Sequence, residues 1–137
     1  MAELGVAASI IAVIQLCATV IGYLNNVKGG SNERQRLLNE IVNTSNILAI
    51  IDSPVKRAQH GARWFTVTAS LCKPGGPIQK FKSVLEGLEV KLAPAAGLKG
   101  VKKALIWPFK KEDVKEILGS IERLKTDLGL AFQSDHM

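Results

Sequence analysis

Aromatic residues and cysteines are both scarce in this sequence. Aromatic side chains make up 5% of the 137 residues, so a core must be built mainly from Leu, Ile, Val and Ala. The two cysteines, Cys17 and Cys72, lie far apart, which excludes a disulfide framework and a zinc site of the usual spacing. Cys17 lies in an apolar run, where a free thiol behaves as a small hydrophobe. Because the two cysteines do not form a disulfide framework, we expect a reduced, intracellular protein.

Motifs of catalysis are also missing from the sequence. No phosphate-binding GxxxxGK[ST] loop occurs, and the two histidines, His60 and His136, have no Cys or Asp at metal-ligand spacing. No Ser or Cys lies in a recognisable nucleophile motif. We therefore expect a protein that is not an enzyme, with no catalytic residues, no cofactor and no metal.

The apolar content and its spacing predict a helical domain. Apolar residues make up 47% of the chain, which excludes a disordered protein, and 137 residues suit one domain. No period-2 alternation between hairpin turns occurs, and the apolar residues recur at helical spacing. The sequence predicts one all-α domain over residues 1–137, a compact bundle of five to six helices around a buried apolar N-terminal helix.

Glycines and prolines divide the chain into its helical segments. The pair Gly29-Gly30 ends the first segment as a C-terminal cap would, and Ser31 or Asn32 can cap the second. Pro77 suits a first helical position because its missing N–H donor is not needed there. The expected helices cover residues 2–27, 31–52, 58–71, 78–92, 98–107 and 110–132.

The run from Leu4 to Leu24 has no charged side chain. A secretory signal does not fit, because the only early charge is Glu3 and the apolar run is too long. The run is apolar on nearly all sides, so we expect the other helices to surround it. It is also long enough to cross a bilayer.

The free energy of membrane insertion of this segment is close to balance. Its ten aliphatic residues favour insertion by roughly 0.3–0.6 kcal/mol each, whereas Gln15, Ser9 and Thr19 oppose it. The sequence is compatible with two interpretations of this segment, a core helix of the bundle and a helix inserted in a membrane. One segment can adopt both states. Small residues four apart, such as Ala8 and Ala12, let helices approach closely in lipid. The candidate inserting residues are Leu4, Val6, Ile10, Ile11, Val13, Ile14, Leu16, Val20, Ile21 and Leu24.

Positive charge is concentrated in the middle of the chain. Residues 1–55 have three Lys/Arg and four Asp/Glu (−1), residues 56–111 have twelve and two (+10), and residues 112–137 have three and six (−3), which sum to the net +6. Such a segment indicates a phosphate-bearing partner, either anionic lipid or nucleic acid. No helix-turn-helix, stacking aromatic set or zinc module accompanies it, so we expect no nucleic-acid partner.

Five lysines cluster around the stretch Trp107-Pro108-Phe109. Each lysine near an anionic leaflet adds roughly 1 kcal/mol of binding, so the cluster predicts contact with anionic lipid. A solvated, solubilising face is the other interpretation, and Trp64 and Trp107 fit either interfacial anchors or core residues. The candidate lipid-binding residues are Lys99, Lys102, Lys103, Lys110 and Lys111.

Four stretches together resemble a known family. They are MAELGVAASIIAVIQL, YLNNVKGGSNERQRLLNEI, GGPIQKFKSVLEGLEVKLAP and WPFKKEDVKEILGSIERLKTDLGLAFQSDHM. This extended pattern resembles the HeLo-like N-terminal domain of fungal NOD-like receptors, and it covers nearly the whole chain. One departure is that the polar tail Gln133 to Met137 has no amyloid-type trigger motif, so the sequence does not indicate how the domain is activated.

The resemblance implies a membrane-active function. In the family, the N-terminal apolar helix is released after oligomerisation, targets the membrane and causes regulated cell death, in innate immunity and heterokaryon incompatibility. By position, the inserting segment is Met1 to about Leu24. The resemblance implies a cytoplasmic domain that moves to the plasma membrane, pore formation without enzyme chemistry, and an NTPase and repeat domains beyond Met137. The alternative is an interaction module that pairs with itself or an adaptor and does not touch lipid.

Overall fold

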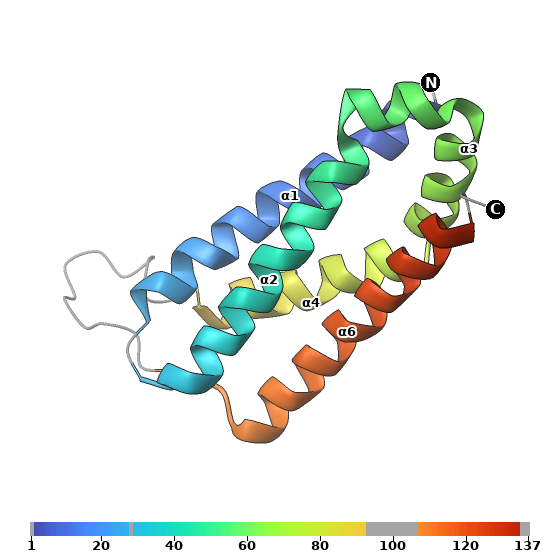
Figure 1. Ribbon diagram of the computed structural model, residues 1–137. Helices are drawn as coiled ribbons and strands as arrows, with labels where there is room; N and C mark the ends of the chain where they lie inside the picture. The colour runs from blue at the N-terminus through green and yellow to red at the C-terminus, as the bar shows by residue number, and fades with distance from the viewer. Residues whose placement is uncertain (1, 28, 93–106, 135–137) are drawn as a thin grey trace.

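The computed structural model describes residues 2–27, 29–92 and 107–134, and these residues form a bundle of five helices (Figure 1). For residues 2–4, 31, 56, 57, 60 and 131–134 it describes the backbone alone. The helices are α1 (Ala2–Asn26), α2 (Ser31–Asp52), α3 (Pro54–Cys72), α4 (Pro77–Leu92) and α6 (Lys111–Ser134). The predicted all-α bundle with an apolar N-terminal helix is confirmed for this part of the chain.

Four of the helices form two antiparallel pairs, α1 with α2 and α4 with α6 (Figure 1). The pairs pack on each other through α1 with α4 and α2 with α6, so each long helix has two long neighbours. The diagonal pairs α1 with α6 and α2 with α4 do not pack together within the described residues. Helix α3 contacts all four and closes the end of the bundle where α1 begins and α6 ends (Figure 1).

Each long helix buries one stripe of residues spaced alternately three and four apart. This spacing keeps one seam of the helix facing its neighbours, as in bundles with coiled-coil packing. In α2 the stripe includes a threonine, Thr44, whose Oγ1 donates a hydrogen bond to the Glu40 carbonyl at 2.8 Å and so needs no other partner. The stripe of α1 and the residue after it is Val6, Ile10, Val13, Cys17, Val20, Leu24 and Val27.

The expectation that other helices surround α1 on most sides is wrong. Only 28% of its most apolar 18-residue window is buried. The reason is geometrical: α1 has α2 and α4 beside it and α3 at one end, which leaves the opposite face outside the bundle. That face is made largely of Ala, Gly, Ser and Thr, whose small side chains lose little when they are exposed.

The predicted helix boundaries are right for residues 31–52 and close for three others. Helix α3 begins at Pro54, four residues before the predicted start, because proline is accepted at the first helical position. Its backbone is non-helical at Gly61 (φ 54°, ψ −126°). The N-cap residue of α2 is Gly30 in the left-handed conformation, not Ser31 or Asn32. The predicted helix 98–107 falls outside the described residues except for Trp107, whose backbone is not helical.

Candidate functional site

The outward face of α1 is free of charge from Gly5 to Asn26. No charged residue lies between Glu3 and Lys28. The pair Ala8/Ala12 and two further pairs of small residues four apart, Gly5/Ser9 and Ala18/Gly22, all lie on this face and are exposed. We call it the α1 outer face, and its exposed members are Gly5, Ala8, Ser9, Ile11, Ala12, Gln15, Ala18, Thr19, Gly22, Asn25 and Asn26.

Three polar side chains on the α1 outer face make hydrogen bonds within the helix. Each donates to the carbonyl four residues earlier: Ser9 Oγ to Gly5 at 2.9 Å, Thr19 Oγ1 to Gln15 at 3.2 Å, and Asn26 Nδ2 to Gly22 at 3.1 Å. A polar group transferred from water to an apolar medium costs several kcal/mol only while it lacks a hydrogen bond. These bonds therefore lower the cost of moving the face into lipid.

The ten predicted inserting residues divide between the core and the surface. Ile11 is 43% exposed, and Ile14, Leu16 and Ile21 are half-buried against the core. The side chain of Leu4 lies outside the described part of the chain. The remaining five, which are fully inside the bundle, are Val6, Ile10, Val13, Val20 and Leu24. Most of the aliphatic surface can therefore reach lipid only if α1 separates from α2 and α4.

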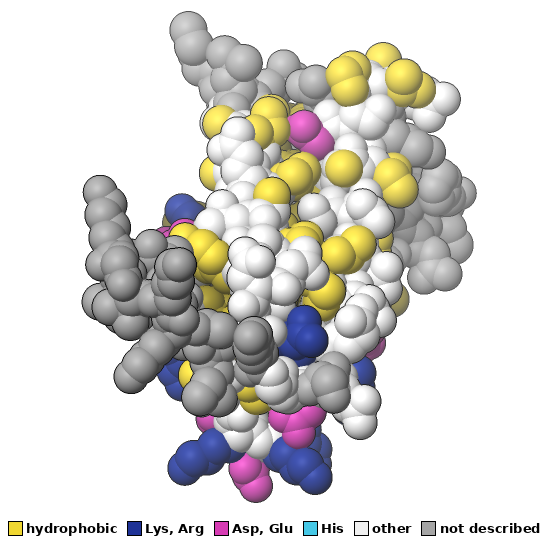
Figure 2. Space-filling model, turned by 90° about the vertical axis from the view of Figure 1, so that its left-hand side faces the viewer, with side chains coloured by type: hydrophobic (Ala, Val, Ile, Leu, Met, Phe, Trp, Pro, Cys, Tyr) yellow, Lys and Arg dark blue, Asp and Glu magenta, His cyan; other side chains and the backbone are white. Residues whose placement is uncertain are grey.

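The neighbouring surface of α2 continues this charge-poor region. Between Leu37 and Ile51 the only charged residue is Glu40, which points toward α6. Ile50 is 57% exposed, and Asn43 and Asn46 are also exposed. Figure 2 shows mainly uncharged and hydrophobic side chains over the upper part of one face, with an acidic side chain among them, and most of the charged side chains toward its lower end.

By length and composition, the segment Gly5–Asn26 of α1 could cross a membrane, and among the described helices no other is both long and apolar enough. The core helix of a soluble protein and a signal sequence pass the same test. Its position in the bundle is a second relevant property. In water, α1 presents an uncharged outer face, and most of its larger aliphatic side chains lie inside the bundle.

The C-terminal end of α1 is held by an arginine and a tryptophan that come from elsewhere. Arg34 of α2 donates from Nη1 to the Leu24 carbonyl at 3.2 Å and from Nε to the Gly29 carbonyl at 3.3 Å. The carbonyls at the C-terminal end of a helix lack N–H donors within the helix, so Arg34 supplies hydrogen-bond donors that α1 itself does not have. The Trp107 ring lies against Gly30 in the turn that follows.

The described part of the predicted lysine cluster lies at the start of α6. Lys110 and Lys111 are exposed, whereas Lys99, Lys102 and Lys103 lie outside the described residues. The backbone N–H of Lys110 donates to Asp113 Oδ2 at 3.0 Å, which fixes the first turn of α6. Trp107, in the segment that leads into α6, packs on Gly30 in the turn that follows α1, although α6 itself does not pack on α1.

The two tryptophans occupy different environments. Trp64 is buried, and its Nε1 donates to the Ile51 carbonyl at 2.8 Å, so it is a core residue. Trp107 is half-buried and meets Phe109 edge-on, with ring centroids 4.9 Å apart. Its Nε1 atom is buried and has no hydrogen-bond partner among the residues that the structure describes. Lys91 Nζ lies 5.3 Å from the centroid of the Phe109 ring, a distance typical of a cation–π contact.

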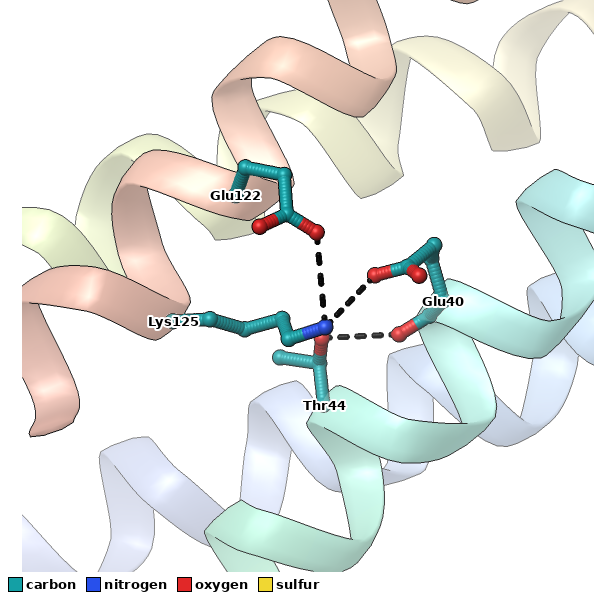
Figure 3. Close-up of polar contacts among 4 residues, drawn as sticks. All are labelled: Glu40, Thr44, Glu122 and Lys125. Carbon is teal, nitrogen blue, oxygen red and sulfur yellow. Dashed lines mark hydrogen bonds and ion pairs between the residues drawn. The ribbon is translucent and has the colours of Figure 1, made fainter.

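An ion pair between α2 and α6 was not predicted from the sequence. Figure 3 shows Lys125 of α6 reaching toward Glu40, with Nζ 2.7 Å from the Glu40 carboxylate and 3.5 Å from that of Glu122. The hydrogen bond and charge of Glu40 raise the pKa of Lys125 above its usual value. The partners are 85 residues apart, and no local sequence pattern links residues at that separation.

Neither cysteine has the properties of a reactive nucleophile. Burial raises the pKa of the Cys17 thiol to about 12, against a smaller lowering by its hydrogen bond with Ser45, and burial raises that of Cys72 to about 11. Both thiols are free. Among the residues that the structure describes, no group of three or more His, Cys, Asp or Glu could hold a metal ion.

Comparison of the chain with protein-family models, with curated proteins and with solved structures finds no match.

Proposed function

We propose that this chain is a membrane-targeting, cell-death-inducing effector domain of a fungal innate-immunity receptor. It acts when α1 leaves the bundle after oligomerisation and inserts into the membrane. The observation that carries the proposal is the position of α1, whose uncharged segment Gly5–Asn26 is long enough to span a bilayer and is buried along a single stripe. The resemblance of the sequence to HeLo-like domains supplies the biological setting.

The outer face makes α1 suited to both environments. In water, the face exposes small side chains and few large apolar ones. In lipid, the hydroxyl donors of Ser9 and Thr19 keep their hydrogen bonds within the helix, and the small residues of the face let inserted helices pack together. The aliphatic stripe that now contacts α2 and α4 would then contact acyl chains or other copies of α1.

Release of α1 in water alone is too costly to occur spontaneously. Seven buried stripe residues, at roughly 1.5–3 kcal/mol each, correspond to about 10–20 kcal/mol, which equals or exceeds the whole stability of a typical domain. Lipid recovers most of this free energy because acyl chains are as apolar as the core. Self-association would cover the surfaces of α2 and α4 that α1 leaves behind. Release is therefore coupled to a membrane and to oligomerisation.

The lysines would bring the domain to an anionic surface before insertion. Lys110 and Lys111 are exposed at the start of α6, just after Trp107, which packs on the turn that follows α1. Lys99, Lys102 and Lys103, which are close to them in the sequence, would also contact the leaflet. Each lysine near an anionic leaflet contributes roughly 1 kcal/mol to the free energy of binding. Headgroup binding there would leave the charge-free length of α1 to enter the acyl region.

The test is dye release from vesicles of phosphatidylcholine and phosphatidylserine by the chain fused at its C-terminus to a trimeric coiled coil. The variant Ile11→Asp/Ala18→Asp places two carboxylates on the outer face seven residues apart. Both wild-type side chains are exposed, so we expect the variant to fold. Each Asp at the centre of an inserted helix costs about 2.5–3.5 kcal/mol. We expect the variant to release dye at least tenfold more slowly than wild type.

The matched control is Thr126→Asp/Leu130→Asp on the exposed face of α6, a helix that does not pack on α1. It adds the same charge and should release dye as wild type does. Equal release by the α1 variant and wild type would exclude insertion of α1. A wild-type fusion that neither floats with these vesicles nor releases dye would contradict the proposal and leave the interaction module as the function.

A further inference from the structure

The groove between α4 and α6 carries a second surface, on the side of the bundle away from α1. Two adjacent basins lie along it, of about 250 and 270 Å³. Both are lined by Val84 of α4 and Ser120 of α6, so these two residues mark the middle of one continuous groove. We call it the α4–α6 groove.

The two ends of the groove differ in charge. At one end the charged lining residues are Lys91, Asp113 and Glu116, with a formal sum of +1 − 2 = −1. At the other end they are Lys80, Arg123 and Asp127, with a sum of +2 − 1 = +1. Five of the six are exposed and Asp113 is half-buried, which leaves their charges available to a partner.

The floor and the centre of the groove suit another helix. Apolar side chains form the floor, including Leu88 and Phe109 at the acidic end and Leu124 at the basic end. Near the centre, Gly87 lines the groove and has open space where a side chain would lie. Small residues at a helix surface let a second backbone approach closely.

We propose that the occupant of the α4–α6 groove is the same groove of a second copy, in a two-fold symmetric dimer. A two-fold axis that passes near Val84 and Ser120, in the plane of the interface and perpendicular to the groove, would place the acidic end of one copy on the basic end of the other. Helix α6 would then lie antiparallel to its partner's α6, with Glu116 of each copy near Arg123 of the partner subunit. Such an interface is self-complementary, as two-fold symmetry requires.

This dimer is separate from membrane insertion, because it leaves α1 and its outer face uncovered. Its test therefore needs no lipid: sedimentation velocity of the unfused chain over a wide concentration range at low salt. Charge reversal distinguishes the proposed geometry from other dimers. In Glu116→Arg the two symmetric contacts become Arg–Arg, and in Arg123→Glu they become Glu–Glu. We expect each variant to raise the dimer dissociation constant at least tenfold.

Mixing the two variants gives the decisive result. In a mixed dimer, the Arg at 116 of one chain meets the Glu at 123 of the other, and the second contact is wild-type, so dimers should reappear. Lys115→Glu, an exposed reversal on the same helix outside the groove, should dimerise as wild type does. A wild-type chain that stays monomeric at all concentrations would overturn the proposal and give the groove to a different partner. Single variants that dimerise normally, or a mixture that does not recover, would overturn it as well.

Discussion

The ring of Trp107 lies directly across Gly30, so that a Cβ atom added to Gly30 would fall 2.4 Å from the ring atoms Cγ and Cδ1. The two residues are far apart in sequence, and their contact joins the turn after α1 to the segment that leads into α6. Gly30 also has a left-handed backbone (φ 57°), which a side chain disfavours. Glycine is therefore required at this position for two independent reasons.

Gly30→Ala should destabilise the fold. The left-handed backbone alone costs about 1–2 kcal/mol for a residue with a Cβ, and displacement of the Trp107 ring adds to it. We expect a lower midpoint in urea unfolding followed by circular dichroism. Gly119→Ala is the control, because it lies in a helix with open space around it and should raise stability by about 0.5–1 kcal/mol. Equal effects of the two substitutions would contradict the packing of Trp107 on Gly30.

Removal of Arg34 should loosen the C-terminal end of α1 before it affects the rest of the bundle. In Arg34→Met the Leu24 and Gly29 carbonyls lose a charged donor, and hydrogen bonds to charged groups contribute roughly 1.5–3 kcal/mol. We expect faster amide hydrogen exchange in the last turn of α1 and unchanged exchange in α6. Arg36→Met, at an exposed position of α2, is the matched control. Exchange that rises equally in both variants would show that the contact does not hold the helix end.

The Lys125–Glu40 pair should stabilise the bundle in a pH-dependent way. The side chains are 25% and 26% exposed, so a double-mutant cycle with Lys125→Met and Glu40→Gln should give a coupling of roughly 0.5–1 kcal/mol at neutral pH. The folded-state pKa of Lys125 is raised above 10.5, so the folded state holds its proton more tightly than the unfolded state. The stabilisation is therefore complete below pH 10.5 and is lost as pH rises through the folded pKa.

The check is urea unfolding of all four proteins of the cycle at neutral pH and above pH 10.5. The coupling should shrink at the higher pH, because the lysine then loses its charge in the folded state also. A coupling that is the same at both values, or absent at neutral pH, would show that the pair contributes through packing alone.

Cys17 should report on whether α1 is in the bundle. A pKa of about 12 in place of 9.0 lowers the thiolate fraction at pH 8 by about a thousandfold, and the side chain is fully buried. In a Cys72→Ser background we therefore expect labelling of Cys17 by a thiol reagent to be limited by opening of the bundle. The complementary Cys17→Ser variant should label faster through the half-buried Cys72. Rapid labelling of Cys17 in the native chain would place α1 outside the core.

The number and positions of the helices follow closely from the sequence, whereas the exposure of α1 does not. Regular apolar spacing predicts α2 to within a residue because the period of a helix is local information. The burial of α1 depends on how many helices surround it, which is a property of the tertiary arrangement. Alanine and glycine on its outer face make the run apolar in composition, although those positions lie outside the core.

The candidate site was predicted only in part, because some of its features are local in the sequence and others depend on the tertiary arrangement. The absence of charge from α1 is visible in the sequence, and so is the position of Lys110 and Lys111. The anchoring of α1 by Arg34 and Trp107 depends on contacts between separate segments that no periodicity reveals. The same is true of the α4–α6 groove, whose two charged ends come from different helices.

Depth-dependent fluorescence quenching tests the insertion of α1 most directly. An environment-sensitive dye would be attached at Gln15→Cys, in the middle of the outer face, and at Thr126→Cys on α6, each in the coiled-coil fusion with both native cysteines changed to serine. The vesicles would contain phosphatidylserine and lipids with a spin label deep in the acyl chain. We predict strong quenching at position 15 and none at position 126. Vesicle-bound protein whose dye at position 15 stays unquenched would contradict insertion of α1.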